Sequence, residues 1–476
     1  MMNTTVSSPL GQLLSRFGSE VIVTAPDVLE GISTDHRKLY EGRALALALP
    51  RSTAEVADIL RLCNALRIPV VPQGGNTGYC AAGTPDDSGT QLVMSLRRMN
   101  RIRSIEPLNN SLVVEAGCIL KEIQLAAESV DRYFPLSLGS EGSCTIGGNL
   151  STNAGGVNVL RYGMTRELTL GLEVVLADGR VLSSLSALRK DNTGYDLRQW
   201  FIGAEGTLGV ITAASLKLFP LPKRHGTAVV AVPSVKCAVE LLADLRAGSG
   251  DRVSSFELLP RSALELVERH LGARINITPD SPWCVLCEVS SSDTEDPIEE
   301  RLASLLEGAM EKGLVTDALL AQNERERLAY WFIRENIPEA QRRDGPSVKH
   351  DVSLPIDRLA EFVDRASEWV ATHVPEGFLV CYGHVGDGNL HFNINQSSGT
   401  AGKSLLAREP DIRRAIHDLV QEFRGSFSAE HGIGRHKVEE LERYTDPVEL
   451  QLMQQLKHAL DPNGILNPGK VLRTPH

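Results

Sequence analysis

Four glycine-rich loops in the first half of the chain restrict its fold more than any other feature. They lie at residues 72–78, 139–148, 152–156 and 203–209. Any one of them could be an ordinary tight turn. Four in one region rich in both helix and strand patterns instead favour a surface of exposed backbone N–H groups that binds a long ligand of several parts.

These loops lack the sequence motifs of two common nucleotide-binding folds. The first loop, Pro72-Gln-Gly-Gly-Asn-Thr-Gly78, follows an expected strand and suits a pyrophosphate. However, no G-x-G-x-x-G opens a helix there, and no glycine loop ends in Gly-Lys-Ser/Thr. NAD of the Rossmann type and ATP of the Walker type are therefore disfavoured.

Length and charge narrow the class of protein further. A chain of 476 residues is too long for one ordinary core, so roughly two or three domains are expected. The formal charge of −11 disfavours nucleic acid as the main partner. We find no apolar stretch long enough to cross a membrane and no charged start of a secretion signal. We expect a cytoplasmic protein, with peripheral membrane association left open.

The eight cysteines are scattered through apolar or glycine-rich surroundings, which favours buried free thiols over a disulfide framework. Cys284 and Cys287 have the spacing of a redox or zinc pair. They lie in Trp283-Cys-Val-Leu-Cys-Glu-Val289, which reads as a buried strand with no second pair nearby. We interpret them as structural thiols.

The periodicity predicts an α+β first region and a second α/β layer domain. Expected helices cover 51–67, 235–247, 322–344 and 439–460. Expected strands cover 68–71, 92–96, 112–116, 174–177, 227–232, 254–258 and 283–289. Asp178-Gly179 is a hairpin signal, and Leu221-Pro-Lys-Arg224 is the best candidate linker. The predicted domains are 1–222, 223–425 and 426–476.

Tyr382-Gly-His-Val-Gly-Asp-Gly-Asn-Leu-His391 has the pattern of a β-hairpin that carries two histidines. With Asp387-Gly388 at the centre of a type I′ turn, His384 would pair with His391, close enough to share one metal ion. Glu430 would complete two histidines and a carboxylate, a set used by catalytic zinc. The alternative, two hydrogen-bonded histidines without a metal, stays open.

Several motifs occur together in an order that resembles a known family. They are the loop at 72–78, Ile146-Gly-Gly-Asn-Leu-Ser-Thr-Asn-Ala-Gly-Gly156, Arg189-Lys-Asp-Asn-Thr-Gly-Tyr-Asp196, Gly206-Thr-Leu-Gly209, the His384 hairpin and Glu430-His-Gly432. The chain resembles the FAD-linked oxidase family with the vanillyl-alcohol-oxidase fold, over roughly residues 37 to 473. Within this family it is most similar to the D-2-hydroxyglutarate and D-lactate dehydrogenase branch.

This resemblance implies an α+β fold: a two-part FAD-binding domain, an inserted α/β cap domain that carries much of the substrate site, and a C-terminal helical segment. The cofactor residues that it implies are Gly74, Gly75, Asn76, Thr77, Gly78, Gly139, Ser140, Thr145, Gly148, Asn153, Gly206, Val210 and Asn467. Relatives with covalent FAD have a histidine where this chain has Asn76. We therefore expect FAD to be bound without a covalent link.

The resemblance also implies which residues would act in the oxidation of a 2-hydroxy acid. A divalent ion, most plausibly zinc, at His384, His391 and Glu430 would bind oxygens of a 2-hydroxy acid, and His431 would be the catalytic base. Arg334 and Lys349 match carboxylate-recognising positions of the family, and Asn393 shares the hairpin face of His391. Taken alone, Arg334 would be a surface helix residue, and the alternative for His431 is a hydrogen-bonded structural histidine. Pro338 stands where 2-hydroxyglutarate-specific relatives tend to have a hydroxyl residue.

The leading hypothesis is an FAD- and metal-dependent D-2-hydroxyacid dehydrogenase, with D-2-hydroxyglutarate as first substrate and D-lactate as second. Electrons would pass to a carrier such as an electron-transfer flavoprotein or to a quinone. The sequence leaves the oligomeric state open, and a homodimer is one candidate. Two other classes compete: a flavin-dependent ether-lipid transferase of the same superfamily, and a flavoprotein that acts only in electron transfer or assembly. The hairpin and the cationic residues favour a small acid.

Overall fold

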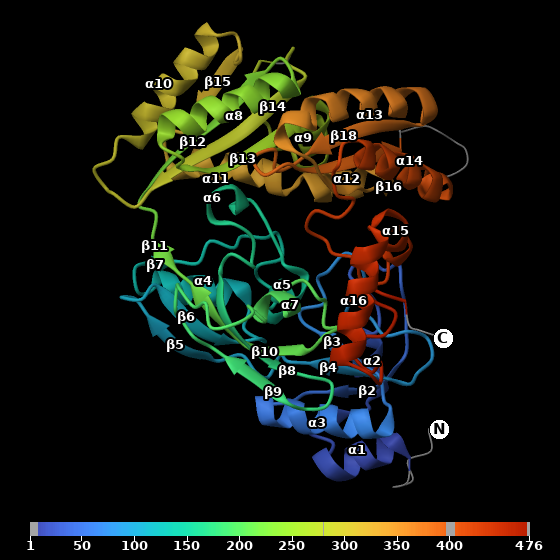
Figure 1. Ribbon diagram of the computed structural model, residues 1–476. Helices are drawn as coiled ribbons and strands as arrows, with labels where there is room; N and C mark the ends of the chain where they lie inside the picture. Colours follow the sequence, from blue (N-terminus) through green and yellow to red (C-terminus); the bar gives the residue numbers. More distant parts are fainter. Residues whose placement is uncertain (1–7, 279, 397–404, 474–476) are drawn as a thin grey trace. The chain divides into compact units, whose positions relative to one another are not determined.

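The computed structural model describes residues 8–278, 280–396 and 405–473. The chain divides into two compact units. Unit 1 contains Met1–Gly155, Met164–Pro220 and Glu430–His476, and unit 2 contains Gly156–Gly163 and Leu221–Ala429. Unit 2 is thus inserted into the sequence of unit 1, as Figure 1 shows by its colours. Whether the predicted boundaries at 222 and 425 delimit separately folding domains stays a prediction.

Unit 1 is built around two main sheets. Its strands are β1 (Ile22–Val23), β2 (Ala44–Ala48), β3 (Val70–Gln73), β4 (Gln91–Ser95), β5 (Ile102–Glu106), β6 (Ser111–Glu115), β7 (Arg132–Tyr133), β8 (Thr169–Val175), β9 (Val181–Ser184), β10 (Val210–Lys217) and β11 (Phe219–Pro220). The first sheet has the order β1-β2-β4-β3, the second the order β5-β6-β10-β8-β9, and β11 pairs with β7. The pair β2–β4 and the pair β3–β4 are parallel.

The helices of unit 1 are α1 (Pro9–Phe17), α2 (Pro26–Ile32), α3 (Thr53–Leu66), α4 (Leu120–Glu128), α5 (Ile146–Thr152), α7 (Arg198–Phe201), α15 (Val438–Tyr444) and α16 (Pro447–Leu460). α3 begins where the sequence predicts, because the Ser52 hydroxyl accepts from the Glu55 N–H. Its apolar face, with Val56, Ile59 and Leu60, is fully buried in a core shared with β2, β3 and β4. This core holds the loop after β3 in place. Figure 1 shows α1 and α3 side by side in unit 1.

The predicted helix at 439–460 is in fact two helices. α15 ends at Tyr444, and α16 begins at Pro447. The Asp446 carboxylate accepts the N–H groups of Val448 and Glu449, so it caps the second helix, and Pro447 occupies a first-turn position where its missing N–H costs nothing. A cap followed by proline therefore overrides the continuous apolar period.

Unit 2 also contains two sheets. Its strands are β12 (Arg224–Val232), β13 (Val253–Pro260), β14 (Trp283–Ser291), β15 (Asp317–Leu320), β16 (Ser347–Val348), β17 (Asp351–Ser353), β18 (Gly377–Tyr382) and β19 (Asn389–Gln396). Its helical segments are α6 (Val159–Tyr162), α8 (Val235–Ser249), α9 (Arg261–Leu271), α10 (Ile298–Glu311), α11 (Glu324–Glu335), α12 (Ile337–Asp344), η1 (Ile356–Arg358), α13 (Leu359–His373), η2 (Leu405–Arg408) and α14 (Glu409–Glu422). One sheet has the order β13-β14-β12-β15. In the other, β19 pairs with β16, β17 and β18.

The hairpin of β18 and β19 is present, but its predicted register is wrong. His391 pairs with Tyr382, not with His384, and residues 383–388 form a longer loop. The reason is a long-range contact: Gly383 leaves the hairpin and exchanges both backbone hydrogen bonds with Leu258 of β13. Gly383 has φ of +138°, a conformation that favours glycine. The local turn signal at Asp387-Gly388 could not reveal this competing partner.

Cys284 and Cys287 are buried free thiols, which confirms their structural interpretation. They lie on β14 and belong to different hydrophobic cores, as expected for residues three apart on a strand. Burial raises the pKa of Cys284 to about 11 and that of Cys287 to about 12. Such thiols are inert at neutral pH.

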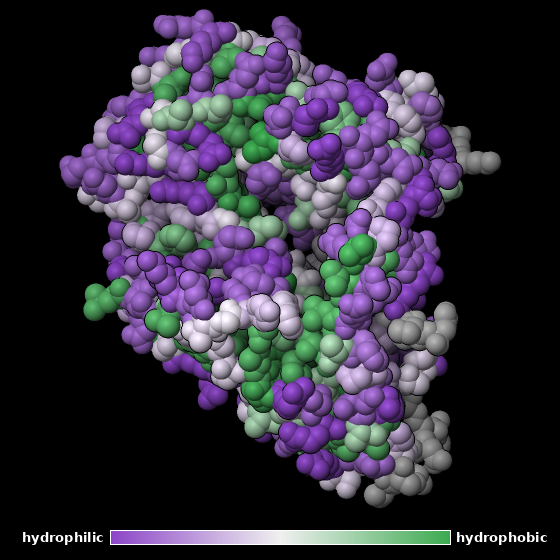
Figure 2. Space-filling model, viewed as in Figure 1, coloured by the Kyte–Doolittle hydropathy of each residue, from purple (hydrophilic) through white to green (hydrophobic). Residues whose placement is uncertain are grey.

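Hydrophilic residues predominate on the face of the molecule that Figure 2 shows. No helix in the described part of the chain is long and apolar enough to cross a membrane. Because most charged side chains reach solvent, a charged residue inside a core is an exception that calls for a physical explanation. Three such residues, Glu205, Glu257 and Arg334, lie in the candidate site.

Candidate active site

The glycine-rich loops of unit 1 line one cleft, as the sequence predicts for a long ligand. The empty space in it is about 1010 Å³, part of it open to solvent. Nine predicted cofactor residues belong to the lining: Gly74, Gly75, Asn76, Thr77, Gly78, Thr145, Gly148, Gly206 and Val210. Further lining residues that the sequence did not single out include Asn149, Ser151, Thr152, Glu205 and Ile211.

Two glycines let the first loop pack closely against the segment between β7 and α5. A Cβ on Gly75 would lie 2.2 Å from the Ser143 carbonyl oxygen, and one on Gly74 would lie 2.6 Å from Thr145 Oγ1. Only glycine fits there. Asn76 takes a left-handed φ of +53° and donates from its amide to the Thr34 carbonyl. The loop therefore presents backbone to the cleft, and Asn76 offers no nucleophile to a flavin.

The remaining four predicted cofactor residues do not line this cleft. Gly139 and Ser140 belong to a turn in which the Ser140 carbonyl accepts from Cys144 N–H. Asn153 ends α5 and accepts from Arg166 N–H. Asn467 is buried and donates to the carbonyls of Ala82 and Glu205. Their assignment as cofactor contacts stays a prediction.

Two of the predicted cofactor region's asparagines, Asn149 and Asn467, are among the described residues with a buried side-chain oxygen that has no hydrogen-bond partner. Asn149 lines the cleft. A buried amide oxygen without a donor is costly, so it indicates a partner that the protein itself does not supply. A ligand with N–H or hydroxyl donors, as FAD has, fits this acceptor.

His431, the predicted base, lines the same cleft from the C-terminal part of unit 1. Its ring stacks on Tyr79 with centroids 4.6 Å apart, and its Nε2 lies 3.6 Å from the Glu430 carboxylate. Burial and then the Glu430 charge raise the pKa of Tyr79. Tyr79 directly follows the first glycine loop, so the predicted base and the predicted pyrophosphate loop are in contact.

Glu205 fixes the segment that follows His431. Its two carboxylate oxygens accept from the N–H groups of Ile433 and Gly434, at 2.7 and 2.8 Å. Burial raises the pKa of Glu205 to about 7, although these two hydrogen bonds act in the opposite direction. Cys80 adds a further link from Sγ to the Gly432 carbonyl. The backbone next to His431 is therefore tied to two loops of the cleft.

In unit 2, the two hairpin histidines are neighbours despite the changed register. Their ring centroids are 5.6 Å apart in an edge-to-face arrangement. Nδ1 of His384 lies 2.6 Å from Glu257 Oε1, so Nε2 is the nitrogen of this ring that could bind a metal. Burial raises the pKa of Asp387, in the loop between the histidines, to about 6.

Asp351 is a second carboxylate beside His391 that the sequence did not single out. It is the Cα partner of His391 in the β17–β19 pair, and candidate ligand atoms of the two residues lie within 4.8 Å. Asn389 donates to the Asp351 carboxylate at 3.0 Å. Within unit 2, therefore, a carboxylate and an imidazole of the kind that binds divalent metals lie together.

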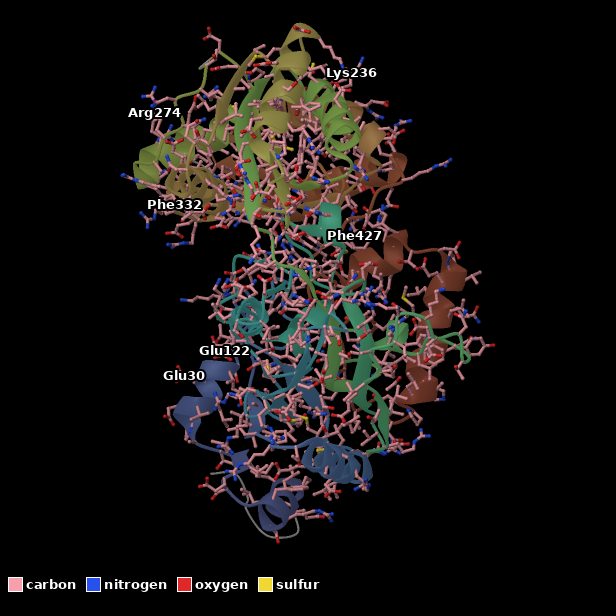
Figure 3. The ribbon with its side chains drawn as sticks, turned by 90° about the vertical axis from the view of Figure 1, so that its left-hand side faces the viewer. Glu30, Glu122, Lys236, Arg274, Phe332 and Phe427 are labelled. Carbon is pink, nitrogen blue, oxygen red and sulfur yellow. The ribbon has the colours of Figure 1, made fainter. Side chains whose placement is uncertain are left out.

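Arg334 is buried rather than on a solvated helix face. Only 6% of it is exposed, whereas its neighbour Phe332 is 46% exposed and lies at the outer edge of unit 2 in Figure 3. Its Nε donates to Glu257 Oε2 at 2.6 Å, and its guanidinium lies over the Tyr382 ring at 5.1 Å. The interpretation that the pattern alone gives, a surface residue, is therefore wrong for Arg334.

Glu257 is the common partner of Arg334 and His384. Burial raises its pKa, but the charges of His384 and Arg334 outweigh burial, and the pKa falls to about 2. The sequence did carry a signal, since Glu257 is the one charged residue in the apolar strand Val253-Ser-Ser-Phe-Glu-Leu-Leu-Pro260. A charge in a buried strand needs a partner, and here it has two.

Lys349 and Asn393 complete the predicted substrate residues. Lys349 is half-buried between β16 and β17. Asn393 accepts from the His350 N–H and donates to Gln341, so its amide is held on both sides. Pro338 lies in the first turn of α12, a favourable position for proline.

Comparison with protein families identifies two matching models. Residues 44–184 match the FAD binding domain, and residues 221–471 match the C-terminal domain of FAD linked oxidases. The first covers most of the cleft-forming region of unit 1. The second contains the whole inserted segment and the His431 loop.

Curated relatives are similar over nearly the whole chain. D-2-hydroxyglutarate dehydrogenase, mitochondrial, of Bos taurus is 44% identical over 95% of this chain and 81% of its own length. D-2-hydroxyglutarate dehydrogenase of Xanthomonas citri is 36% identical over 95% of this chain and 94% of its own length. The D-2-hydroxyglutarate–pyruvate transhydrogenase of Saccharomyces cerevisiae is 35% identical over 94% of this chain and 90% of its own length.

Solved structures agree on the fold. p-Cresol methylhydroxylase with substrate bound has a TM-score of 0.73 at 16% identity and covers 98% of this chain and 96% of its own. Alkyldihydroxyacetonephosphate synthase also has a TM-score of 0.73, at 15% identity, over 97% of this chain and 84% of its own. The predicted α+β, two-part FAD-binding fold is confirmed. The chain belongs to the FAD-linked oxidase family that includes the D-2-hydroxyglutarate dehydrogenases.

Proposed function

We propose that this protein oxidises a D-2-hydroxy acid to the 2-oxo acid with bound FAD and a divalent metal, and that D-2-hydroxyglutarate is the substrate. The observation that carries this proposal is the 44% identity over 95% of the chain with a D-2-hydroxyglutarate dehydrogenase. The site residues proposed from the sequence support the same chemistry. D-Lactate is the second candidate substrate.

The residues of the FAD cleft fit the cofactor. Backbone of the 72–78 loop suits the pyrophosphate, and the unpaired Asn149 oxygen suits a donor of the cofactor. Bound flavin would supply the two-electron acceptor for the C2 hydride. Asn76 supports a non-covalent complex, because an amide bonded to the Thr34 carbonyl cannot form the flavin link that a histidine can.

The residues of unit 2 fit a carboxylate and a divalent metal. His384 and His391 of unit 2 are the proposed imidazole ligands, Asp351 lies beside His391 as a carboxylate, and Glu430 stays the third ligand expected from the sequence, which together give the residue types that zinc uses. A metal ion there would supply Lewis acidity toward the hydroxyl oxygen. Arg334 would bind the C1 carboxylate through its guanidinium, and Lys349 would add a second positive charge.

His431 would accept the hydroxyl proton. A neutral imidazole is a suitable base near pH 7, and its stacking on Tyr79 and its nearness to Glu430 limit its orientation. Asn393 would hold the substrate through its amide. Because both ends of that amide are already hydrogen-bonded, any such contact uses the remaining amide hydrogen or lone pair.

The electron acceptor is the least constrained part of the proposal. An electron-transfer flavoprotein or a quinone was expected from the sequence. The Saccharomyces cerevisiae relative carries pyruvate in its name, which favours testing a 2-oxo acid as a second kind of acceptor. Several relatives are named mitochondrial and others are not, so a cytoplasmic location stays a prediction.

The experiment is an anaerobic titration of the purified FAD protein with D- and L-2-hydroxyglutarate, D- and L-lactate, and D-malate, followed by absorbance of the oxidised flavin. We expect D-2-hydroxyglutarate to reduce the flavin at the lowest concentration. Reduced enzyme is then mixed with pyruvate or with a quinone analogue to identify the acceptor class. Reduction by none of the acids would overturn the proposal, and preferential reduction by D-lactate would replace its substrate.

A further inference from the structure

Glu257 uses its two carboxylate oxygens for two different functional side chains. Oε1 lies 2.6 Å from His384 Nδ1, and Oε2 accepts from Arg334 Nε at 2.6 Å. Only 1% of the Glu257 side chain is exposed. Water cannot replace either contact, so a change in the position of this carboxylate affects both partners.

The two partners reach Glu257 from separate parts of the unit 2 fold. Arg334 comes from the last turn of α11, and His384 from the loop after β18. The bridge between Leu258 and Gly383 sets the distance, because it joins the residue after Glu257 to the residue before His384. Gly383 has a φ of +138°, which favours glycine, and a Cβ there would also make a tight contact of 3.1 Å with the Asn389 carbonyl oxygen.

Tyr382 makes a second contact with Arg334 and also contacts His391. The Tyr382 ring lies under the Arg334 guanidinium and 5.0 Å from the His391 ring. The guanidinium is thus held between an anion and an aromatic face. Arg334 is connected in this way to both hairpin histidines, through Glu257 to His384 and through Tyr382 to His391.

We infer that Glu257 is a positioning residue that couples the metal-binding His384 to the substrate-binding Arg334, so that the two halves of the unit 2 site adopt their working geometry together. The inference rests on the proposed function, because it takes His384 as a metal ligand and Arg334 as the carboxylate receptor. It adds a residue and a coupling to that function.

The physical basis is different for each partner. A carboxylate that accepts from Nδ1–H fixes the imidazole tautomer and leaves the lone pair on Nε2, the nitrogen a metal needs. For Arg334, engagement of Nε orients the planar guanidinium so that its terminal nitrogens form the edge that binds a substrate carboxylate. A shift of the Glu257 carboxylate would therefore reorient both the His384 imidazole and the Arg334 guanidinium.

The first test measures zinc affinity alone, with no substrate, by competition against a chromophoric chelator. Glu257→Gln keeps the size of the side chain but replaces one acceptor by an amide donor, so one of the two contacts is lost. We expect zinc affinity to fall by about 10- to 100-fold, as for other residues that orient a metal-binding histidine. Glu288→Gln is the matched control, because Glu288 is an equally buried carboxylate on the adjacent strand that pairs with another α11 arginine.

FAD content and the thermal midpoint accompany each variant, since the flavin cleft belongs to unit 1 and reports folding independently. Unchanged zinc affinity in folded Glu257→Gln would overturn the inference. Equal losses in Glu257→Gln and Glu288→Gln would also overturn it, because a general effect of a buried charge would then account for both.

The second test is a double-mutant cycle on zinc affinity, again without substrate. Arg334→Ala should weaken zinc binding by at least about fivefold in the wild-type background and by less than about twofold in the Glu257→Gln background. A plain structural role would give the same factor in both backgrounds, which would contradict the coupling.

The outcomes also separate this inference from the proposed function. If His384→Ala binds zinc as tightly as wild type does, the metal assignment of His384 fails and the coupling fails with it. If wild type binds zinc and is reduced by D-2-hydroxyglutarate while the cycle shows no coupling, only the inference fails.

Discussion

Two arginines of α11 show how one type of contact serves different purposes in this protein. Arg327 and Arg334 lie about two turns apart on the helix, and each donates from Nε to a buried glutamate of the adjacent sheet. The Arg327–Glu288 distance is 2.7 Å and the Arg334–Glu257 distance is 2.6 Å. Both glutamates have a pKa lowered to about 2, against the effect of burial.

The two pairs differ in what else the glutamate touches. Glu288 also accepts from the Trp331 indole of the same helix and from the Thr227 hydroxyl of the neighbouring strand β12, and it lies 3.2 Å from His225 Nδ1 of that strand. The remaining contact of Glu257 is His384, from a hairpin loop. The other partners of Glu288 lie on α11 and on the adjacent sheet, so its ion pair with Arg327 serves the packing of the helix on that sheet. Glu257 also contacts a histidine in a loop, so its ion pair with Arg334 orients that loop as well.

The largest effects should come from removing either arginine. Arg334→Ala and Arg327→Ala each remove the arginine partner of a buried carboxylate, so each should lower the free energy of unfolding by about 3 to 5 kcal/mol. Only Arg334→Ala should also weaken binding of 2-oxoglutarate, the expected product, by about 2 kcal/mol or more. Urea unfolding and calorimetric titration measure the two quantities.

Arg334→Lys serves as the control for this comparison. It keeps the buried positive charge but lacks the planar guanidinium, so stability should largely recover while affinity for 2-oxoglutarate does not. Equal losses of product affinity in the Arg327 and Arg334 variants would break the distinction between the two pairs.

Acid should reveal the contribution of the ionised Glu288 carboxylate, whose pKa is lowered, against the effect of burial, by its contacts with His225 and Arg327. The pKa of Glu288 is lowered from 4.5 to about 2, so its stabilising contribution is present above pH 4.5 and is lost as the pH falls toward 2. A shift of this size corresponds to about 3 kcal/mol. The other charged or titratable groups that face it are Arg327 and His225.

Urea unfolding of wild type and Glu288→Gln tests this expectation. It is measured between about pH 2.5 and 5, the range over which the lowered pKa of Glu288 makes the stability depend on pH. The stability difference between them should shrink as the pH falls, because wild type loses what the variant already lacks. A difference that stays constant over this range would show that Glu288 is not ionised in the folded protein.

Trp331→Phe should have a smaller effect, confined to stability. It removes the indole N–H that donates to Glu288 at 3.0 Å and keeps an aromatic ring in the core. A lost hydrogen bond to a charged acceptor costs about 2 kcal/mol. Zinc affinity and the rate of flavin reduction should match wild type, and a change in either would mean that the Glu288 pair also influences the site.

Phe332→Ala should have the smallest effect of the series. Phe332 lies between the two arginines in sequence, on the exposed side of α11. We expect a change in the free energy of unfolding of less than about 1 kcal/mol and unaltered kinetics. A large loss would indicate that this face of the helix is covered in solution.

Much of the fold follows from local signals in the sequence. Ser52 caps α3, Asp178-Gly179 joins β8 to β9, and four glycine loops belong to one cleft with nine of the predicted cofactor residues. The cap and the hairpin turn depend on neighbouring residues only, whereas the cofactor residues followed from the resemblance to a family. The division of 439–460 into two helices was predictable in principle from Asp446-Pro447, which is also local.

Features that depend on distant partners escaped prediction. The hairpin register changed because Gly383 pairs with Leu258, which lies more than a hundred positions away in the sequence. Arg334 is buried because Glu257 neutralises it, and Asp351 became a candidate ligand through its register with His391. The residue types at the site could be inferred from motifs, whereas the carboxylates that hold them required the three-dimensional structure.

The most direct test of the central claim is the rate of anaerobic flavin reduction by D-2-hydroxyglutarate, measured by stopped-flow absorbance before and after chelation. The account predicts rapid reduction of the metal-loaded enzyme by the D isomer and none by the L isomer. After chelation it predicts a rate lower by about 10²-fold or more, restored by zinc, with FAD still bound. Equal reduction by both isomers, or full activity of enzyme shown to be free of metal, would contradict it.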